Sequence, residues 1–225
     1  MLPTYNEAGN IANLIRQILA LHIPNLQILV IDDESPDGTA EEARKLKKEN
    51  VGVIVRKGLR GRGRAGRAGY EIALRKGADL IIEMDADFSH SPQHIPELIE
   101  MASEYDIVLG SRLLASSKDE ERPLGRRILT RAANWYVRAF LGLKIRDCNS
   151  GFRCFRRSAL TAILPHLSAN GPDIIQESIY WASKEGLRIK EIPIIFRGRA
   201  KGQSKLGMKQ FMKGIATVLE LRKRR

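Results

Sequence analysis

The fold is decided by one stretch of sequence, Leu80-Ile81-Ile82-Glu83-Met84-Asp85-Ala86-Asp87. Its apolar part predicts a buried strand, and its end carries two carboxylates in a D-x-D pattern. Because ligands bind at the carboxyl ends of strands in open α/β folds, we expect both acids at the lip of a sheet. Successive side chains of a strand point to opposite faces, so the two acids can serve one site only if the chain turns there. A divalent cation that holds a phosphate would explain the pair, and so would a solvated acidic turn before the next helix.

Apolar runs of strand length alternate with helical patterns along the first half of the chain. Short, continuously apolar runs predict strands buried on both faces at 26–32, 51–56, 79–84 and 106–110. Helices are expected at 7–21, 37–49, 66–77 and 92–103. This rhythm predicts a Rossmann-like α/β fold, with a mostly parallel sheet and helices on both faces. Only Met1-Leu2-Pro3 precedes the first helix, so we expect the first strand to be nearly absent.

The second half of the chain is less regular. It predicts helices near 124–141 and 172–185, a strand within 147–157 and another at 188–196. No repeat or long linker divides the 225 residues, so we expect a single domain over 1–225. No apolar run approaches the roughly 20 residues that span a bilayer, and 1–25 does not resemble a signal peptide. The spacing of Cys148 and Cys154 argues against structural zinc and fits a reducing compartment.

The chain carries a net charge of +12, from 38 Lys and Arg against 26 Asp and Glu. Nucleic acid, an anionic membrane face or a phosphate-bearing substrate could each explain this excess. The basic residues cluster at 56–75, 122–138, 197–213 and 222–225. Several clusters follow predicted strands, which favours a binding site over a generally basic surface.

Two turns near the start of the chain carry candidate nucleotide contacts. The segment Pro3-Thr4-Tyr5-Asn6-Glu7 fits a capping box, with Thr4 as the N-cap and Glu7 three residues on. It also fits a turn after a first strand, where the Tyr5 ring can lie against a nucleotide base. Asp32 stands at the tip of the strand at 26–32, where a carboxylate can accept hydrogen bonds from a base or a ribose.

The segment Gly61-Arg62-Gly63-Arg64-Ala65-Gly66 matches the dinucleotide pattern G-x-G-x-x-G. It follows the third strand and a long loop, whereas a dinucleotide site uses the first strand of a βαβ unit. We therefore interpret it as a phosphate or pyrophosphate cradle that leads into a helix. One short Arg-Gly copy is a weak signal for RNA binding.

Further basic residues follow the later strands. The segment Gly110-Ser111-Arg112 stands at the end of the strand at 106–110, and the next helix carries Arg126, Arg127 and Arg131 with Thr130. A basic loop after 188–196 contains Arg199, Lys201, Ser204 and Lys205. Solvated basic faces are the simplest account of such runs, but arginines at several strand ends, opposite an acidic loop, favour a phosphate-rich site.

Six motifs occur in order: Pro3-Thr4-Tyr5-Asn6-Glu7, Asp32-Asp33-Glu34-Ser35-Pro36-Asp37-Gly38-Thr39, Met84-Asp85-Ala86-Asp87-Phe88-Ser89-His90, Gly110-Ser111-Arg112, Asp147-Cys148-Asn149-Ser150-Gly151-Phe152-Arg153 and Gly202-Gln203-Ser204-Lys205. This ordered set resembles the dolichol-phosphate mannosyltransferases, which are inverting glycosyltransferases of family 2 with the GT-A fold. The resemblance covers nearly the whole chain.

The resemblance implies roles for individual residues. The guanosine of GDP-mannose would contact Pro3, Tyr5, Glu7, Val30 and Asp32. The diphosphate would be held at Asp85, Ala86 and Asp87, with Asp85 and Asp87 binding Mg²⁺ or Mn²⁺. Donor contacts would also come from Arg112, Arg199 and Lys205, and the acceptor phosphate would be bound by Arg112, Arg126, Arg127 and Thr130. Asp87, Arg112 and Arg199 would be the catalytic residues, and Ser89 stands where some relatives have a metal-binding Gln.

The implied reaction moves mannose from GDP-mannose to dolichyl or another polyprenyl phosphate. A phosphate monoester has a second pKa near 6, so the acceptor is largely ionised at pH 7 and needs no strong base. We therefore assign no catalytic base to His90 or His94. Three alternatives remain: a polyprenyl-phosphate glucosyl- or N-acetylglucosaminyltransferase with a UDP donor, a basic nucleic-acid-binding module that would not need Asp85 and Asp87, and an inactive chain.

The implied acceptor lies in a membrane. The resemblance thus implies a peripheral enzyme on the cytoplasmic face of a membrane, with or without a small membrane-anchor subunit and without a nucleic-acid partner. An amphipathic helix is expected at about 207–221, with the apolar residues Met208, Phe211, Met212, Ile215 and Leu219 at helical spacing. This stripe is expected either to pack on the domain or to lie at the membrane interface.

Overall fold

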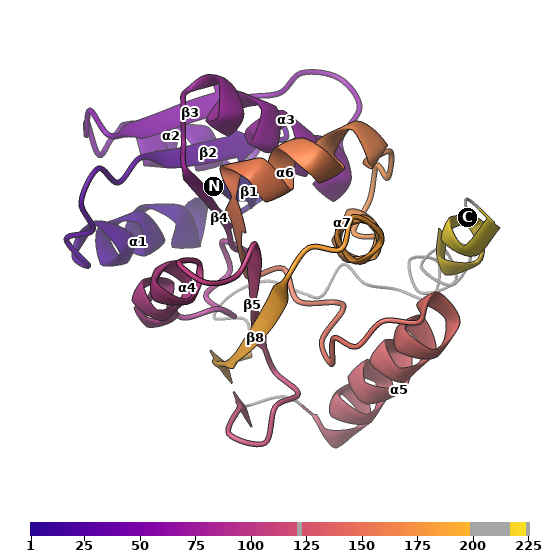
Figure 1. Cartoon of the computed structure of the whole chain (residues 1–225). Coiled ribbons are helices and arrows are strands. Elements are labelled where there is room, and N and C mark those ends of the chain that lie inside the picture. The colour runs from indigo at the N-terminus through magenta and orange to yellow at the C-terminus, as the bar shows by residue number, and fades with distance from the viewer. Residues whose placement is uncertain (121–122, 199–216, 224–225) are drawn as a thin grey trace.

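A computed structural model of the chain describes residues 1–120, 123–198 and 217–223 (Figure 1). The strands are β1 Leu2–Thr4, β2 Ile28–Asp32, β3 Val51–Val55, β4 Leu80–Glu83, β5 Ile107–Ser111, β6 Lys118–Asp119, β7 Arg153–Arg156, β8 Ile189–Pro193 and β9 Ile195–Phe196. The helices are α1 Ala8–Leu19, α2 Thr39–Arg44, α3 Arg62–Arg75, α4 Ile95–Met101, α5 Leu124–Leu141, α6 Arg157–Ile163 and α7 Ile174–Lys184. Two short 3₁₀ helices are η1 Pro92–His94 and η2 Leu164–His166.

The strands pair in three groups, of which the smallest consists of β6 and β9. Parallel pairing joins the first group in the order β1-β2-β3, and a second group has the order β4-β7-β5-β8. These first two groups meet at Met1, whose ammonium donates to the carbonyl of Ile82 at 2.7 Å and whose carbonyl accepts from the amide of Met84. Within the second group β7 runs antiparallel to β4 and β5, whereas β8 is parallel to β5. The prediction of a mostly parallel α/β sheet is confirmed.

Helices cover both faces of the sheet because alternate residues of each strand point to opposite sides. On β5, Val108 packs in the core under α1, α2 and α4, whereas Ile107 and Leu109 pack in the core under α3, α6 and α7. On β7, Cys154 and Phe155 divide in the same way. Side chains at the ends of the strands are therefore supported from two cores.

Strands β1 and β3 flank β2 in the first group, and each differs from what the sequence predicts. The first strand, which we expected to be nearly absent, is present as β1: its three residues are all buried and paired with β2. The expectation that 51–56 is buried on both faces is wrong: β3 is partly buried along one side only, and Ile54 on its other side is exposed. β3 ends the order β1-β2-β3, and a strand at that position has an open face despite its apolar sequence.

Helix α3 begins at Arg62, four residues before the predicted start at 66. Glycine disfavours helices, so the Arg-Gly segment predicts a loop. The structure uses those glycines for close packing instead: a Cβ at Gly63 would lie 2.2 Å from the carbonyl oxygen of Ala169. Helix α6 was not predicted, and it follows β7 directly.

The C-terminal part of the chain is described only at 217–223, which is helical. Val218 and Leu221 are buried in the core, and Thr217 donates to Asp173 at 3.1 Å. Leu219 is exposed, because the buried face of the described helix runs through residues 218 and 221. This leucine does not pack on the domain, and the membrane-interface alternative for the stripe stays a prediction. Met208, Phe211, Met212 and Ile215 lie outside the described residues. In the described part of the chain no helix combines the length and hydropathy that a bilayer crossing needs.

Candidate active site

The two acids of the D-x-D motif follow β4 after one intervening residue, Met84. The chain bends at 86–89, and Phe88 takes a left-handed backbone with φ +62°. Ser89 donates its amide (3.1 Å) and its hydroxyl (2.6 Å) to Oδ1 of Asp87, which is buried. The Asp85 side chain is 35% exposed. The turn that a shared site requires is therefore present, with one acid fixed and the other partly open.

A buried charged cluster lies beside Asp85. The Arg62 guanidinium donates to Glu83 at 2.5 Å and to Oδ1 of Asp85 at 3.3 Å. Glu83 also accepts from the Tyr70 hydroxyl at 2.6 Å, and Arg153 lies 3.8 Å away. Burial alone would raise the pKa of Glu83, but the charges of Arg62 and Arg153 outweigh it and hold that pKa below its usual value. The sequence analysis gave this cluster no function; the signal was a carboxylate inside a buried strand, which requires a buried counter-charge.

His90 is buried beside the D-x-D motif and contacts its backbone. Its buried ring stacks on Phe152 at 5.2 Å and meets the edge of Phe196 at 5.4 Å. Burial lowers its pKa, although Asp85 and Asp87 act in the opposite direction. A neutral imidazole can accept at Nδ1, where the Asp85 amide points at 3.5 Å. His90 thus has a structural place, as does His94, whose Nε2 accepts from the amide of Ile195.

Arg112 stands at the end of β5, on the same side of the sheet as the D-x-D motif. Its Nε and Nη2 atoms donate to Asp147 at 2.7 and 2.6 Å, and its amide donates to the same carboxylate at 3.0 Å. Burial lowers the pKa of Arg112, but Asp147, Asp119 and Asp85 together raise it. The resemblance gave Asp147 only as part of a motif, and the structure shows that it holds Arg112.

The candidate nucleotide contacts lie on two turns that are tied together. The amides of Asn6, Glu7 and Ala8 donate across to Ser35, Thr39 and Asp37. The capping-box interpretation is therefore wrong: Glu7 is the N-cap of α1, and its first turn is capped by side chains of the other turn. Thr4 instead belongs to β1 and donates to Asp32 at 3.0 Å.

The Tyr5 side chain is partly exposed, whereas Asp32 is buried. The Arg60 guanidinium lies over the Tyr5 ring at 4.8 Å and donates to its hydroxyl at 2.7 Å. Asp32 is buried, and Ser35 donates its amide and hydroxyl to the Asp32 carboxylate at 2.8 and 2.6 Å. Pro3 is part of β1 and is buried with it.

Val30 lies in the middle of β2 with no exposed surface, packed in the apolar core. In this structure its side chain offers no surface to a base. Its place in the donor site stays a prediction that rests on the resemblance, as does the place of Pro3, Tyr5, Glu7 and Asp32.

The candidate acceptor residues lie on the first turns of α5. Arg126 is exposed, Thr130 donates to the carbonyl of Arg126 at 2.9 Å, and Arg127 lies 4.0 Å from Asp119. The charge of Asp119 also helps to raise the pKa of Arg112, so Arg112 and Arg127 interact with the same carboxylate. Arg199 and Lys205 lie outside the described residues.

The interpretation of the Gly61–Gly66 segment as a phosphate cradle is contradicted. The amide of Gly61 donates to Asp33 at 2.7 Å, and the amide of Gly63 donates to the carbonyl of Asn170 at 3.1 Å. A Cβ at Gly61 would also lie 2.3 Å from that carbonyl oxygen. The glycines serve a backbone contact with the loop at 169–170, so these amides have protein partners in place of an anion.

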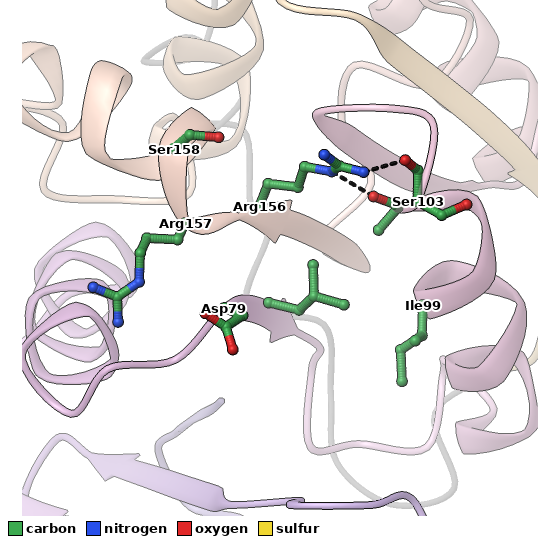
Figure 2. Close-up of a pocket in the computed structure, with 8 residues that line it drawn as sticks. Asp79, Ile99, Ser103, Arg156, Arg157 and Ser158 are labelled. Carbon is green, nitrogen blue, oxygen red and sulfur yellow. Dashed lines mark hydrogen bonds between the residues drawn. The ribbon is translucent and has the colours of Figure 1, made fainter.

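A hollow of about 480 Å³ lies away from these residues (Figure 2). It is lined at the amino end of β4 by Asp79 and Leu80, and across it by Ile99, Ser103 and Arg156. Arg156 donates there to the carbonyls of Ala102 and Ser103. The acids of the D-x-D motif stand at the opposite, carboxyl end of β4. We therefore place the candidate active site at that end, because the carboxylates lie there, and not in the hollow.

Asp85, Asp87 and the adjacent Ser89 hydroxyl supply hard oxygen donors, which fit Mg²⁺ or Mn²⁺. Among residues 1–120, 123–198 and 217–223, no group of three or more His, Cys, Asp or Glu side chains could hold a metal ion. A cation at this pair would therefore need oxygen atoms from a ligand or from water to complete its coordination.

Comparison with known proteins identifies the family. The model of glycosyl transferase family 2 matches residues 1–164. The chain is 34% identical to the undecaprenyl-phosphate mannosyltransferase of Micrococcus luteus, over 92% of this chain and 86% of that protein. It is 33% identical to the polyprenol monophosphomannose synthase of Mycolicibacterium smegmatis, over 98% and 84%.

A third relative is the dolichol-phosphate mannosyltransferase of Pyrococcus furiosus, 34% identical over 99% of this chain and 63% of that longer protein. Among solved structures, glucosyl-3-phosphoglycerate synthase from Mycobacterium tuberculosis with Mn²⁺, UDP-glucose and phosphoglyceric acid matches with a TM-score of 0.71. That match is 20% identical and covers 99% of this chain and 78% of that one, so it shows the GT-A fold alone. The chain belongs to glycosyl transferase family 2.

Proposed function

We propose that this glycosyltransferase moves mannose from GDP-mannose to dolichyl or another polyprenyl phosphate, with inversion at the anomeric carbon. Three relatives at 33–34% identity carry names that specify transfer of mannose to such lipids or its product. One observation carries the proposal: Asp85 and Asp87 at the end of β4, and Arg112 at the end of β5, share one edge of the sheet. Carboxylates that can bind a metal ion and an arginine that can bind a phosphate thus lie at the end of the sheet where ligands bind in this class of fold.

Asp85 and Asp87 would hold Mg²⁺ or Mn²⁺ at this edge. When bound, the cation would offset the charge that develops on the leaving diphosphate. Ser89 keeps Asp87 oriented through two hydrogen bonds, so this carboxylate needs little reorganisation. Tyr5, Glu7 and Asp32, on the tied turns after β1 and β2, would then receive the nucleoside together with Pro3 and Val30.

The acceptor brings a second anion to the same edge. Arg112, with Arg126, Arg127 and Thr130 of α5, would bind its phosphate. Because that phosphate is ionised at pH 7, these cations lower the repulsion between the two anions and no proton acceptor is required. Arg199 and Lys205 would add to the donor contacts, with Arg199, Asp87 and Arg112 acting on the reacting groups.

Helix α5 also supports a position at a membrane. Its exposed large apolar side chains are Leu124, Ile128, Leu129 and Trp135, and its exposed cations include Arg126 and Arg131. An apolar and basic face of this kind suits the interface of an anionic bilayer. We propose that the enzyme rests peripherally on the cytoplasmic face of a membrane, with or without a small anchor subunit.

The test is a transfer assay with the purified chain and polyprenyl phosphate. GDP-mannose and UDP-glucose are compared as donors, each with Mn²⁺, Mg²⁺ or EDTA. We expect lipid-linked mannose only from GDP-mannose with metal, and about a 100-fold loss in Asp87→Asn. Asp79→Asn, at the other end of β4, is the matched control and should keep full activity.

Other results would change the assignment. Transfer from UDP-glucose instead would favour the UDP-sugar alternative. RNA binding that tightens when Asp85 and Asp87 are neutralised, with no transfer from either donor, would favour the nucleic-acid module. Equal transfer by Asp87→Asn and the parent chain would contradict the metal assignment.

A further inference from the structure

Arg62 is shared between two carboxylates with different surroundings. Its Nη1 lies 2.5 Å from Glu83, which is fully buried, and its Nη2 lies 3.3 Å from Oδ1 of Asp85, which is 35% exposed. The Arg62 side chain itself is only 17% exposed. One guanidinium thus links the interior of the sheet to the exposed acid of the D-x-D motif.

The buried end of this link is firmly held. Glu83 accepts from the Tyr70 hydroxyl at 2.6 Å, and burial and Glu83 raise the pKa of Tyr70, which keeps that hydroxyl protonated. Arg153 lies 3.8 Å from Glu83 on the other side. Because Glu83 has these further partners, it stays fixed and holds one side of the Arg62 guanidinium, so that only the other side reaches Asp85.

Gly151 packs against the exposed end of this link. A Cβ at Gly151 would lie 3.2 and 3.3 Å from the two Asp85 oxygens and 3.4 Å from Nη2 of Arg62. The start of α3 is also fixed, because Gly61 and Gly63 pack on the loop at 169–170. The guanidinium therefore stays beside the carboxylate that a cation would use.

We propose that Arg62 is a positioning residue that holds Asp85 through Oδ1 and makes the binding of a divalent cation depend on a nucleoside diphosphate. This rests on the proposed function, in which Asp85 is a metal ligand. A fixed positive charge a few ångströms from the metal position opposes a second cation there. The negative charge of a bound diphosphate offsets that repulsion, so cation and nucleotide enter together. By linkage, the cation strengthens nucleotide binding by the same factor.

The test measures Mn²⁺ binding to the full chain by electron paramagnetic resonance, with and without GDP. Without GDP we expect Arg62→Gln to bind Mn²⁺ about tenfold more tightly than the parent chain, and the gain from adding GDP to shrink accordingly. Arg62→Lys, which keeps the charge, should behave like the parent. Arg75→Gln removes a cation from the exposed end of the same helix and is the matched control, with no change in affinity.

A second variant separates this role from a loss of folding. Glu83→Gln removes the inner partner of Arg62, so the guanidinium turns fully to Asp85 and Mn²⁺ binding should weaken. Both Arg62→Gln and Glu83→Gln disturb the buried cluster, so circular dichroism is used to show whether each variant remains folded. A purely structural role would weaken Mn²⁺ binding in both variants, whereas the proposal requires opposite changes.

Three results would overturn the inference. One is an affinity of Arg62→Gln, without GDP, no higher than that of the parent chain. Another is an equal gain in Arg75→Gln, which would indicate a general charge effect. If the parent chain binds Mn²⁺ with GDP in either case, the proposed metal site stands and only the role of Arg62 fails. Absence of Mn²⁺ binding in every variant, with and without GDP, would overturn both.

Discussion

The Arg112 guanidinium is bound to Asp147 through two side-chain hydrogen bonds and lies over the Phe196 ring at 5.1 Å. Asp147 is fully buried, and the amides of Arg146 and Asp147 donate to Glu191. The charge that we assign to a phosphate contact is therefore fixed in place before any ligand arrives. Pre-organisation of this kind reduces the reorganisation needed during a reaction.

Replacing Asp147 should destabilise the protein strongly. In Asp147→Asn, Arg112 loses its counter-charge while it remains largely buried, and breaking such a pair costs about 3–5 kcal/mol. Urea unfolding at pH 7 would measure the change. Asp106→Asn is the control, because its partner Arg188 is mostly exposed and the loss should stay below about 1 kcal/mol. Similar losses in the two variants would contradict the account of Arg112.

Both thiols should be unreactive in the folded protein. Cys148 and Cys154 are free and buried, and burial raises the pKa of each to about 12. Since the thiolate is the reactive form, we expect no labelling by a disulfide reagent at pH 8 under native conditions. After unfolding in urea, two thiols should react at once. Rapid native labelling of either cysteine would show that the core opens at that position.

At the scale of the element, α3 depends on the absence of side chains at its start. Gly63 brings the helix against Ala169, and the buried Glu177 of α7 holds the same loop through the amides of Ser168 and Ala169. One helix thus positions a second through a loop, and Arg62 is placed by that contact.

Gly63→Ala should lower the free energy of unfolding by about 1–3 kcal/mol, because the new Cβ meets backbone that must shift. Gly125→Ala in α5 is the matched control: a Cβ there has nothing within 4 Å. Helix propensity predicts that it is neutral or stabilising by up to about 1 kcal/mol. Thermal unfolding of the two variants would show opposite or clearly unequal shifts if α3 is packed as described.

The exposed apolar side chains of α5 should drive membrane binding. Ile128→Ser with Leu129→Ser is expected to reduce binding to anionic liposomes about tenfold or more, since two apolar side chains are lost from the interface. Leu59→Ser removes an even more exposed leucine from the loop before α3 and should have no effect. The measurement is co-sedimentation at low and high salt. An equal loss of liposome binding in both variants would indicate that any exposed apolar side chain contributes, and not the face of α5 in particular.

At the scale of the molecule, buried acids govern the response to low pH. Burial alone would raise the pKa of Asp147, but Arg112 outweighs it, so the folded pKa lies below the ordinary value of 3.8. The unfolded chain then binds the proton first, and the stability from this acid is fully present above pH 3.8 and is lost as the pH falls through the folded pKa. The stability difference between the parent chain and Asp147→Asn should therefore be constant from pH 7 to about 5 and shrink below 4. Urea midpoints across this range would measure it, and a constant difference down to pH 2 would contradict the lowered pKa.

Local patterns predicted much of this fold, and long-range pairing limited the rest. The continuous apolar run of β2 identifies a buried strand, whereas the similar run of β3 does not reveal that it lies at the edge of its group. At the site, the place of Asp85 and Asp87 follows from the end of β4. The partnership of Arg62 with Glu83 joins two segments across a loop and a helix, and no local period encodes it.

The position of β7 has a consequence for synthesis of the chain. β4 and β5 are not paired with each other, because β7 lies between them although it follows both in sequence. As the chain leaves the ribosome, these two strands emerge first and keep unpaired edges until 153–156 arrives. Open edges are prone to pairing with other chains, and contacts distant in sequence form slowly. Truncation before Arg153 should leave a nascent chain whose first three strands can pair but whose sheet stays divided.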